Sequence, residues 1–496
     1  MIEHHLPALL VVVPLVAAVV TALIRHGIAA YVTTLVASWT LPVMALMLLG
    51  QVLDGGEVSY ALGDWAPPVG IEYRVDGANA PLLVLVAAMA ALVATYAPRS
   101  VASEIDIGRR GWFYTMFLLC VAGLLGIAIT ADAFNAFVFL EISSLATYVL
   151  IALGRDRRAL LAAYQYLILG TIGATLYVVG VGLIFVMTGS LNMGDVAARL
   201  AGIENTRPIF AALAFITVGI SLKLALFPLH VWLPNAYAFA PSMATAFLAS
   251  TATKVAVYLL LRFLFSLFGT DFVFVQHPIT PILLALSLAA MFAASFVAVF
   301  QEDIKRMLAY SSVAQIGYIT LGVALATQTG LTGAMVHVLN HALIKGALFL
   351  AVGCIVYRTG VFRIDQLAGI GRTMPVTMAA FVIAGLGLIG VPGTVGFVSK
   401  WYLVAAALEQ GWWWLALAIV ASSLIAVVYV GRIVEIAWFR EPSSRVRAGK
   451  RLPIEMIAVT WVMAGATIYF GLDAEFTAGL AGRAADTLLA GLAGPG

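Results

Sequence analysis

The sequence predicts an all-α integral membrane protein with about fourteen transmembrane helices, two of them broken within the membrane. First, 63% of the 496 residues are hydrophobic and only 10% are charged, whereas a soluble domain carries about 25% charged residues. Second, apolar runs of about twenty residues, each long enough to cross ~30 Å of hydrocarbon, recur along the chain. Third, proline or glycine interrupts two of these runs beside a lysine.

The apolar runs follow one another with short polar connections, and only Ala131-Asp132 separates the fourth run from the fifth. The first run lacks a basic leading segment and a small-residue cleavage site, so we interpret it as a retained helix and not a signal peptide. The fourteen predicted spans lie at 6–24, 29–50, 79–98, 112–130, 133–153, 159–187, 209–229, 242–264, 277–299, 304–326, 331–357, 375–400, 413–438 and 454–472.

Basic residues are distributed unevenly between the two sides of these spans. With the N-terminus outside, seventeen basic residues, among them Arg25, Lys305, Arg445 and Arg447, fall in inner loops, and five, among them Arg262, fall outside. Since inner loops carry the excess of Lys and Arg, we predict a multi-pass protein of the cell (inner) membrane with both termini on the periplasmic side. The net charge of +3 is not pooled in one patch, so no nucleic-acid partner is expected.

The two cysteines, Cys120 and Cys354, both lie inside predicted helices. They fit neither a disulfide framework nor a CxxC motif, and we interpret them as packing residues. The chain offers no Fe–S ligand set or haem-ligand pair, so no cofactor and no redox centre of its own is predicted. Whether the protein is an enzyme is therefore left open.

Four lysines, Lys223, Lys254, Lys345 and Lys400, lie deep within apolar spans. A lysine at mid-bilayer costs ~2.5–3.5 kcal/mol on insertion scales, so four cost on the order of 10 kcal/mol. Arg432 lies near a helix end, where its long side chain can reach the interface. The lysines therefore predict a functional interior that moves protons.

Glu141 is the one carboxylate well inside an early span. It can be a structural counter-ion for a lysine of another helix, or its pairing can control when that lysine holds its proton. The two interpretations are compatible.

The seventh span contains Pro228, five residues after Lys223. Proline removes a backbone donor and breaks the helix, and broken backbone within a membrane lines a wet cavity or is buried in protein. His230 lies beyond the break, where it can pass a proton toward the inner face or be an ordinary interfacial histidine. The twelfth span repeats the pattern with Pro392 and Gly393 before Lys400.

The eleventh span places His337, His341 and Lys345 at intervals of four residues, and hence on one helix face. Imidazoles titrate near neutrality, which favours a proton relay over plain helix packing. A metal site is disfavoured because no third zinc-type ligand is evident and the lysine cation lies beside the histidines. Lys254 in the eighth span is flanked by the hydroxyls of Ser250, Thr251 and Thr253, which can bond an ammonium.

The two breaks occupy equivalent positions if spans 4–8 and 9–13 are repeats, and five helices per repeat make the second inverted relative to the first. We therefore predict N-terminal helices at 1–111, a first inverted repeat at 112–268, a second at 269–440, and a final helix with an outer tail at 441–496.

Four segments closely resemble one family of proteins: 223–262 around Pro228-Leu-His230, 303–318 with its Asp-Ile-Lys-Arg start, His337 to Lys345, and Gly390 to Lys400. The family is that of the proton-translocating antiporter-like subunits of respiratory complex I, membrane-bound hydrogenases and Mrp-type sodium/proton antiporters. The resemblance covers roughly spans 3 to 14. Length and ending are most similar to the D subunit of Mrp-type antiporters.

The resemblance implies fourteen core helices and a hydrated axis of charged residues at mid-membrane. By position, Glu141 is the carboxylate paired with Lys223, Lys254 and the histidines of the eleventh span connect the halves, and Lys400 is the terminal lysine. It also implies partner membrane subunits, with sodium handled by one of them. The open alternatives are a redox-coupled subunit of a complex I-like or hydrogenase assembly, a non-conducting scaffold, and an autonomous sodium transporter.

Overall fold

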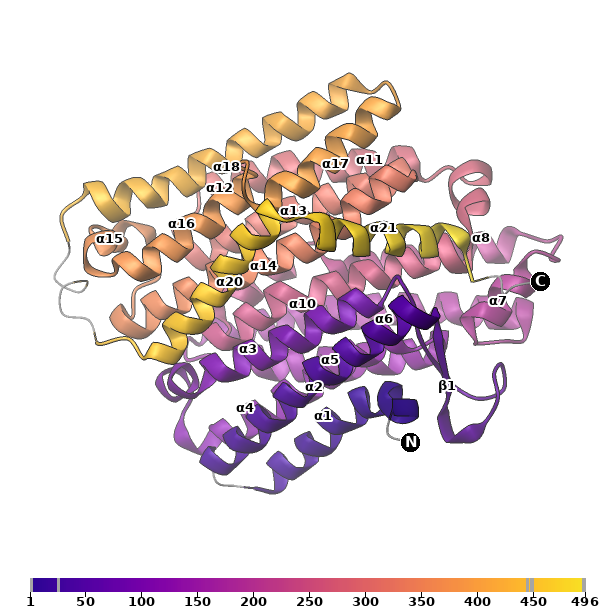
Figure 1. Ribbon diagram of the computed structural model, residues 1–496, viewed down its shortest axis with the longest axis horizontal. Helices are drawn as coiled ribbons and strands as arrows, with labels where there is room; N and C mark the ends of the chain where they lie inside the picture. The colour runs from indigo at the N-terminus through magenta and orange to yellow at the C-terminus, as the bar shows by residue number, and fades with distance from the viewer. Residues whose placement is uncertain (1–2, 25–26, 443–445, 447–449, 493–496) are drawn as a thin grey trace.

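The computed structural model describes residues 3–24, 27–442, 446 and 450–492. Within these residues, 13 helices are long and apolar enough to cross a membrane, and a shorter apolar helix spans Pro375–Ile389. They form a bundle of roughly parallel and antiparallel helices (Figure 1). The predicted all-α, multi-span membrane fold is confirmed. Of the basic residues used to predict the orientation, Arg25, Arg445 and Arg447 lie outside the described residues.

The first half of the chain contains the only strands among the described residues. Its elements are α1 (Leu6–Leu23), α2 (Gly27–Gly55), β1 (Val58–Ala61), β2 (Glu72–Val75), α3 (Ala80–Glu104), α4 (Arg110–Ile129), α5 (Ala133–Ala152), α6 (Arg158–Thr188), α7 (Met193–Leu200), α8 (Arg207–Leu224), α9 (Trp232–Phe239) and α10 (Ser242–Leu261).

The second half is helical throughout its described residues. After the π-helical turns η4 (Arg262–Leu267) and η5 (Asp271–Gln276) come α11 (Thr280–Ala289), η6 (Ala290–Ala294), α12 (Ser295–Val299), α13 (Ile304–Leu325), α14 (Gln328–Thr359), α15 (Ile370–Thr373), α16 (Pro375–Ile389), α17 (Val395–Glu409), α18 (Trp413–Phe439), α20 (Ile454–Leu472) and α21 (Glu475–Ala490).

Three long helices form the centre of the bundle. Within the most apolar stretch of each, 94% of α10 with η4, 94% of α13 and 89% of α14 is buried, against 33% of α18. The outer helix α18 turns Leu417, Val420 and Leu424 outward, as a helix facing lipid does. Lysines on α10 and α14 are therefore enclosed by protein and not by hydrocarbon.

Both ends of the chain lie beside the β1–β2 hairpin, at one end of the bundle (Figure 1). The ring of His5 is bonded to the hydroxyl of Tyr60 at 2.9 Å. Near the C-terminus, the N–H of Leu492 donates to the carbonyl of Ser266 at 3.4 Å. The termini thus share one side, as an even number of crossings requires.

The two predicted helix breaks are present. The first follows Leu224, where Ala225 has a φ of 60° and ends α8 in the left-handed region. The second lies between α16 and α17, where Gly390 and Gly393 have φ of 90° and 84°, values that glycine adopts without a Cβ clash. The broken helices fall at the fourth position of spans 4–8 and of spans 9–13, and they run in opposite directions because α7 and α15 lie at opposite ends of the bundle (Figure 1).

Two predicted boundaries were wrong. The twelfth span does not end at Lys400 but continues in α17 to Glu409. The segment after Leu472 is not an outer tail, because residues 475–490 form α21, which packs Leu480, Ala484 and Leu488 inward. Its mixed composition obscured it, since a short helix with one apolar face has no continuous apolar run.

A buried ion pair ties the hairpin end of the bundle to α10. Arg262 donates to the carboxylate of Asp76 at 2.8 Å, and both side chains are 5% exposed. The sequence placed Arg262 among the outer loops, so its burial is a correction. Burial raises the pKa of the Asp76 carboxyl, but Arg262 and the N–H groups of Ala78 and Asn79 outweigh this and hold the pKa below its usual range.

We expect the Asp76→Asn variant to unfold more readily, by about 3–5 kcal/mol, because a buried guanidinium loses its counter-charge. A carboxyl with a lowered folded pKa stabilises the fold at pH above its unfolded value of about 3.9 and loses this contribution as pH falls through the folded value. The wild-type free energy of unfolding should therefore include an Asp76 term that is present at pH 7 and lost below about pH 4. Unfolding of the detergent-solubilised chain at both pH values tests this. The control is Glu57→Gln, which removes an exposed partner of Arg74 and should shift stability by less than about 1 kcal/mol.

Candidate functional site

The first buried cation lies immediately before the first helix break. Lys223 is in the last turn of α8, 6% exposed. Its ammonium donates to the hydroxyl of Ser144 at 2.7 Å and lies 3.5 Å from Oε1 of Glu141, both on α5. The predicted Glu141–Lys223 pairing is present in the structure, and Ser144 completes it.

A small cavity connects Lys223 with the central helix α10. Its volume is about 20 Å³, and it is lined by the hydroxyl-bearing residues Ser143, Ser144 and Thr147 and reaches α10 at Ala252 and Ala256. A space of this size with several hydroxyls suits one water molecule. It gives the ammonium of Lys223 a polar contact toward the helix that carries the next lysine.

Lys254 lies in the middle of α10 and is 1% exposed. Its ammonium donates to the carbonyl of Ala249 and to the hydroxyl of Thr253 at 3.4 Å. The expected bonds from the other two hydroxyls are absent, because Ser250 and Thr251 donate to carbonyls of their own helix. Helix hydroxyls commonly satisfy themselves on the preceding turn.

The histidines and lysine of α14 share one buried face, as their spacing predicts. His337, His341 and Lys345 are 1%, 0% and 0% exposed, and the two imidazole rings lie 6.0 Å apart with an interplanar angle of 15°. Lys254 is close enough to interact electrostatically with all three. The face of α14 thus continues the line of groups that begins at Lys223.

Helix α13 supplies the hydrogen-bond partners of this face. Gln315 bonds Nε2 of His337 at 3.0 Å, and Lys345 donates to Ser311 and, at 2.9 Å, to the carbonyl of Leu308. Among the described residues, neither ring nitrogen of His341 has a hydrogen-bond partner. His337 is therefore held in a fixed orientation, whereas His341 has both nitrogens available for proton transfer.

The last buried cation lies after the second break. Lys400 is in α17 and reaches back to the carbonyls of Leu388 and Ile389 at 3.1 and 2.8 Å. These are among the last carbonyls of α16, where a helix end carries partial negative charge. The ammonium also lies 4.8 Å from the ring centre of Tyr318. Lys400 therefore caps a half-helix, whereas Lys223 ends one and pairs with a carboxylate.

His337 also bonds Ser399, the neighbour of Lys400, with 2.8 Å between Nδ1 and Oγ. This bond joins the α14 face to the second break. The structure thus brings together seven of the eight predicted pathway residues: Glu141, Lys223, Lys254, His337, His341, Lys345 and Lys400.

His230 lies apart from this line. Its ring stacks on Phe227 with centroids 5.1 Å apart and lies edge-on to Tyr310 at 6.2 Å. Pro228 is in the turn between α8 and α9 and is exposed, so the backbone at Ala225 and not the proline ring itself ends α8. Pro392 likewise lies between Gly390 and Gly393 in the second turn.

Sequence reasoning missed the residues that bond the charged groups, namely Ser144, Ser311, Gln315, Tyr318 and Ser399. Part of the signal was available, since Ser311, Gln315 and Tyr318 occur in a segment used for the family resemblance. Single hydroxyls and amides carry no marked cost in an apolar span, so their partners become visible only in three dimensions.

Comparison with known proteins assigns the chain to a family. The family described as NADH:quinone oxidoreductase/Mrp antiporter, TM, matches residues 130–426. The N subunit of the NADH-quinone oxidoreductase of Desulforudis audaxviator is 42% identical over 486 residues, which are 95% of this chain and 96% of that relative. The chain belongs to the NADH:quinone oxidoreductase/Mrp antiporter family. The predicted family is confirmed.

Other members of the NADH:quinone oxidoreductase/Mrp antiporter family match along most of the chain. The D subunit of the Na(+)/H(+) antiporter of Alkalihalophilus pseudofirmus is 30% identical, with 85% of both chains covered. One chain in the structure of the membrane-bound sulfane sulfur reductase, an archaeal respiratory membrane complex, superposes with a TM-score of 0.90 at 30% identity, with 98% of both chains covered. The family fold therefore extends beyond the matched segment to both ends of this chain.

Proposed function

We propose that this chain is the proton-conducting subunit of a multisubunit cation/proton antiporter of the Mrp type. The observation that carries the proposal is the buried line of titratable groups from Glu141 to Lys400, because packing alone gives no reason for four lysines in a membrane interior. Protons would pass between amines and imidazoles through hydrogen-bonded hydroxyls and water. Sodium would be handled by a partner subunit.

The position of Glu141 supports assembly with partner membrane subunits. Its side chain is 26% exposed, although it lies in the middle of a membrane span. It belongs to the outward face of α5, between the exposed residues Val138 and Leu145. A partly exposed carboxylate facing lipid is costly, so we infer that a neighbouring subunit covers this face. The multisubunit names of the family's relatives agree with that inference.

We further propose that the end of the bundle with both termini faces outward, since the predicted inner loops carry most of the basic residues. The residue ranges 1–111, 112–268, 269–440 and 441–496 remain our proposed division into N-terminal helices, two inverted repeats and a C-terminal segment. The opposite directions of the two broken helices support the inversion.

A redox-coupled assembly is the second candidate. It is favoured by the higher identity to the N subunit of an NADH-quinone oxidoreductase, 42% against 30% for the D subunit of an antiporter. In that case the same line of groups would move protons, and the driving reaction would take place in other subunits. A scaffold would not need the line at all. An autonomous sodium transporter would need more oxygen ligands at mid-depth than Asp132 and Glu141 provide.

Inside-out vesicles that contain the complete complex distinguish the two candidates. For an antiporter, sodium added to vesicles with a preformed pH gradient should dissipate that gradient without any electron donor. For a redox-coupled complex, sodium should have no effect and an electron donor should build the gradient. The Lys223→Ala complex is the control, and normal proton movement in it would contradict proton conduction by this chain.

A further inference from the structure

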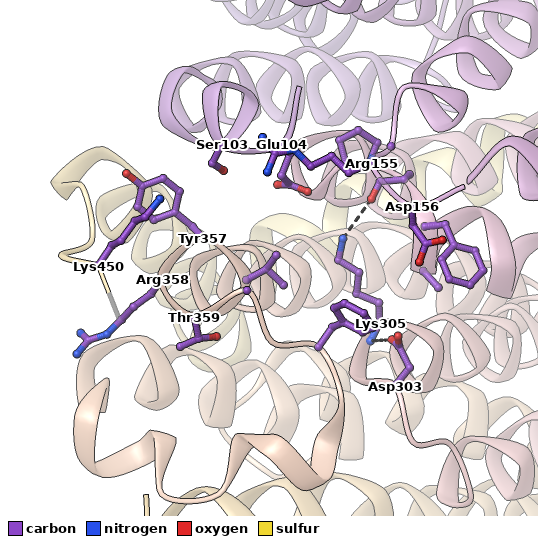
Figure 2. A pocket seen from close by; sticks show the side chains of 18 residues that line it. Ser103, Glu104, Arg155, Asp156, Asp303, Lys305, Tyr357, Arg358, Thr359 and Lys450 are labelled. Atoms are coloured by element: carbon purple, nitrogen blue, oxygen red, sulfur yellow. Dashed lines mark hydrogen bonds between the residues drawn. The ribbon is translucent and has the colours of Figure 1, made fainter. Parts of the chain in front are cut away.

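A pocket of about 460 Å³ opens at the end of the bundle opposite the termini. It lies where α3, α9, α13 and α14 end (Figure 2). Figure 2 shows charged side chains converging on it from several connections, with Lys305 below the rim formed by Arg155 and Asp156. By the proposed orientation, this pocket faces the inner side of the membrane.

The three carboxylates of the pocket all have partners. Glu104 accepts from the N–H and the hydroxyl of Ser242 at 3.0 and 3.2 Å, and so caps the start of α10. Asp156 is paired with Arg158 at 2.6 Å. Asp303 accepts from two N–H groups at the start of α13. Burial raises the pKa of the Asp303 carboxyl above its usual range, which these bonds only partly offset, so it accepts protons more readily than an exposed aspartate.

Lys305 forms the floor of the pocket and is 5% exposed. The sequence placed it in a solvated inner loop, so its burial is a correction. Its ammonium donates to one protein acceptor, the carbonyl of Ala240 at 3.1 Å, although an ammonium has three N–H groups. Glu104 and Asp303 interact with it electrostatically. The other cations lining the pocket are Arg155, Arg358 and Lys450.

Helix α13 leads from this floor to the buried line of charges. The carbonyl of Leu308, three residues beyond Lys305 and hence about 4.5 Å further along the helix, accepts from Lys345 at 2.9 Å. The same carbonyl accepts from the hydroxyls of Ser311 and Ser312 at 2.9 and 3.0 Å. Lys305 and Lys345 are thus anchored about one helical turn apart.

We propose that this pocket is the inner mouth of the proton pathway and that Lys305 transfers protons between the pocket and Lys345. The proposal deepens the proposed function and rests on it. An N–H bond of the Lys305 ammonium breaks, the proton crosses hydrogen-bonded hydroxyls and water, and an N–H bond forms on the neutral amine of Lys345. Lys305 then takes up a proton from the pocket.

The alternative role for Lys305 is structural. Its bond to Ala240 places a cation at the C-terminal end of α9, where it stabilises the half-helix. Arginine would preserve this role, because it keeps the charge and the donors but does not release its proton. Lys305→Arg and Lys305→Met therefore separate transfer from capping.

The test measures proton movement in inside-out vesicles with the complete complex, whose inner face meets the medium. Both Lys305→Met and Lys305→Arg should slow it by about tenfold or more, and acidifying the medium should restore part of the rate in the methionine variant, where protons must reach Lys345 directly. The matched control is Arg306→Met, the adjacent basic residue, which does not line the pocket and should conduct like wild type.

Chemical restoration provides a second, independent measurement. In Lys305→Cys, 2-aminoethyl methanethiosulfonate added to the medium attaches an amine at the position of the lost ammonium. We expect the rate to rise at least about threefold toward wild type, with no change in treated wild type, whose cysteines are buried. Wild-type rates in both Lys305→Met and Lys305→Arg, or a normal rate in Lys305→Arg alone, would overturn the proposal. If Lys223→Ala also conducts normally, the proposed function itself fails.

Discussion

Replacing Lys223 with alanine is expected to abolish ion-coupled proton movement, with a loss of at least about 100-fold, while the complex still assembles. Lys223 is the only cation next to Glu141 among the described residues, at 3.5 Å, and it faces the cavity toward α10. Without its amine, a proton arriving from the α5 side has no acceptor before Lys254. The measurement is the rate of pH-gradient dissipation in vesicles, with assembly checked by co-purification of the partner subunits.

Glu141→Gln should reduce the rate to a similar extent for a different reason. The amide keeps the size and one hydrogen-bond acceptor of the carboxylate but leaves the buried ammonium of Lys223 without a counter-charge. The double variant Glu141→Gln with Lys223→Met should therefore assemble better than Glu141→Gln alone, although neither conducts. Thr217→Val, on the helix that carries Lys223, is the control. An undiminished rate in either single variant would remove this pair from the pathway.

Replacing Lys400 with methionine is expected to stop proton transfer through the second half of the chain, again by at least about 100-fold. Its ammonium caps the last carbonyls of α16 at the second break, and the neighbouring Ser399 is bonded to His337. The variant thus removes the end of the line and one cation from the break. Lys400→Arg should keep the break intact and still fail to conduct, because guanidinium does not release its proton.

The same vesicle assay measures this second loss, and Glu409→Gln at the exposed end of α17 is the matched control. A thermal unfolding curve for each variant separates damage to the fold from loss of transfer. If Lys400→Arg conducts normally, the cation at the break is structural and the pathway ends before it.

How far the sequence predicts this protein can be argued from particular residues. The spacing of His337, His341 and Lys345 predicted one helix face, because a helical period is a local property. Pro228 and Gly393 predicted the breaks for the same reason. The pairing of Glu141 with Lys223 came from the family resemblance, since two helices that are separated in the chain give no local sign of contact.

Charged residues at predicted helix ends were the least predictable. Lys305 and Arg262 were both assigned to loops by their position at the edge of an apolar run. In the fold, one lies under the loops that form a pocket and the other is paired with Asp76. The one-sided apolar pattern of α21 was also missed, because its partner face on α14 is not visible in its own composition.

The sequence by itself determined the solvent, the approximate number of spans, the family and the identity of the buried lysines, because each depends on composition or on neighbours in the chain. Only the tertiary structure decided what each lysine touches: Ser144 for Lys223, the carbonyl of Leu308 for Lys345, and the end of α16 for Lys400. The physical reason is that a proton moves across a few ångströms between groups on different helices. Those distances are set by how the helices pack.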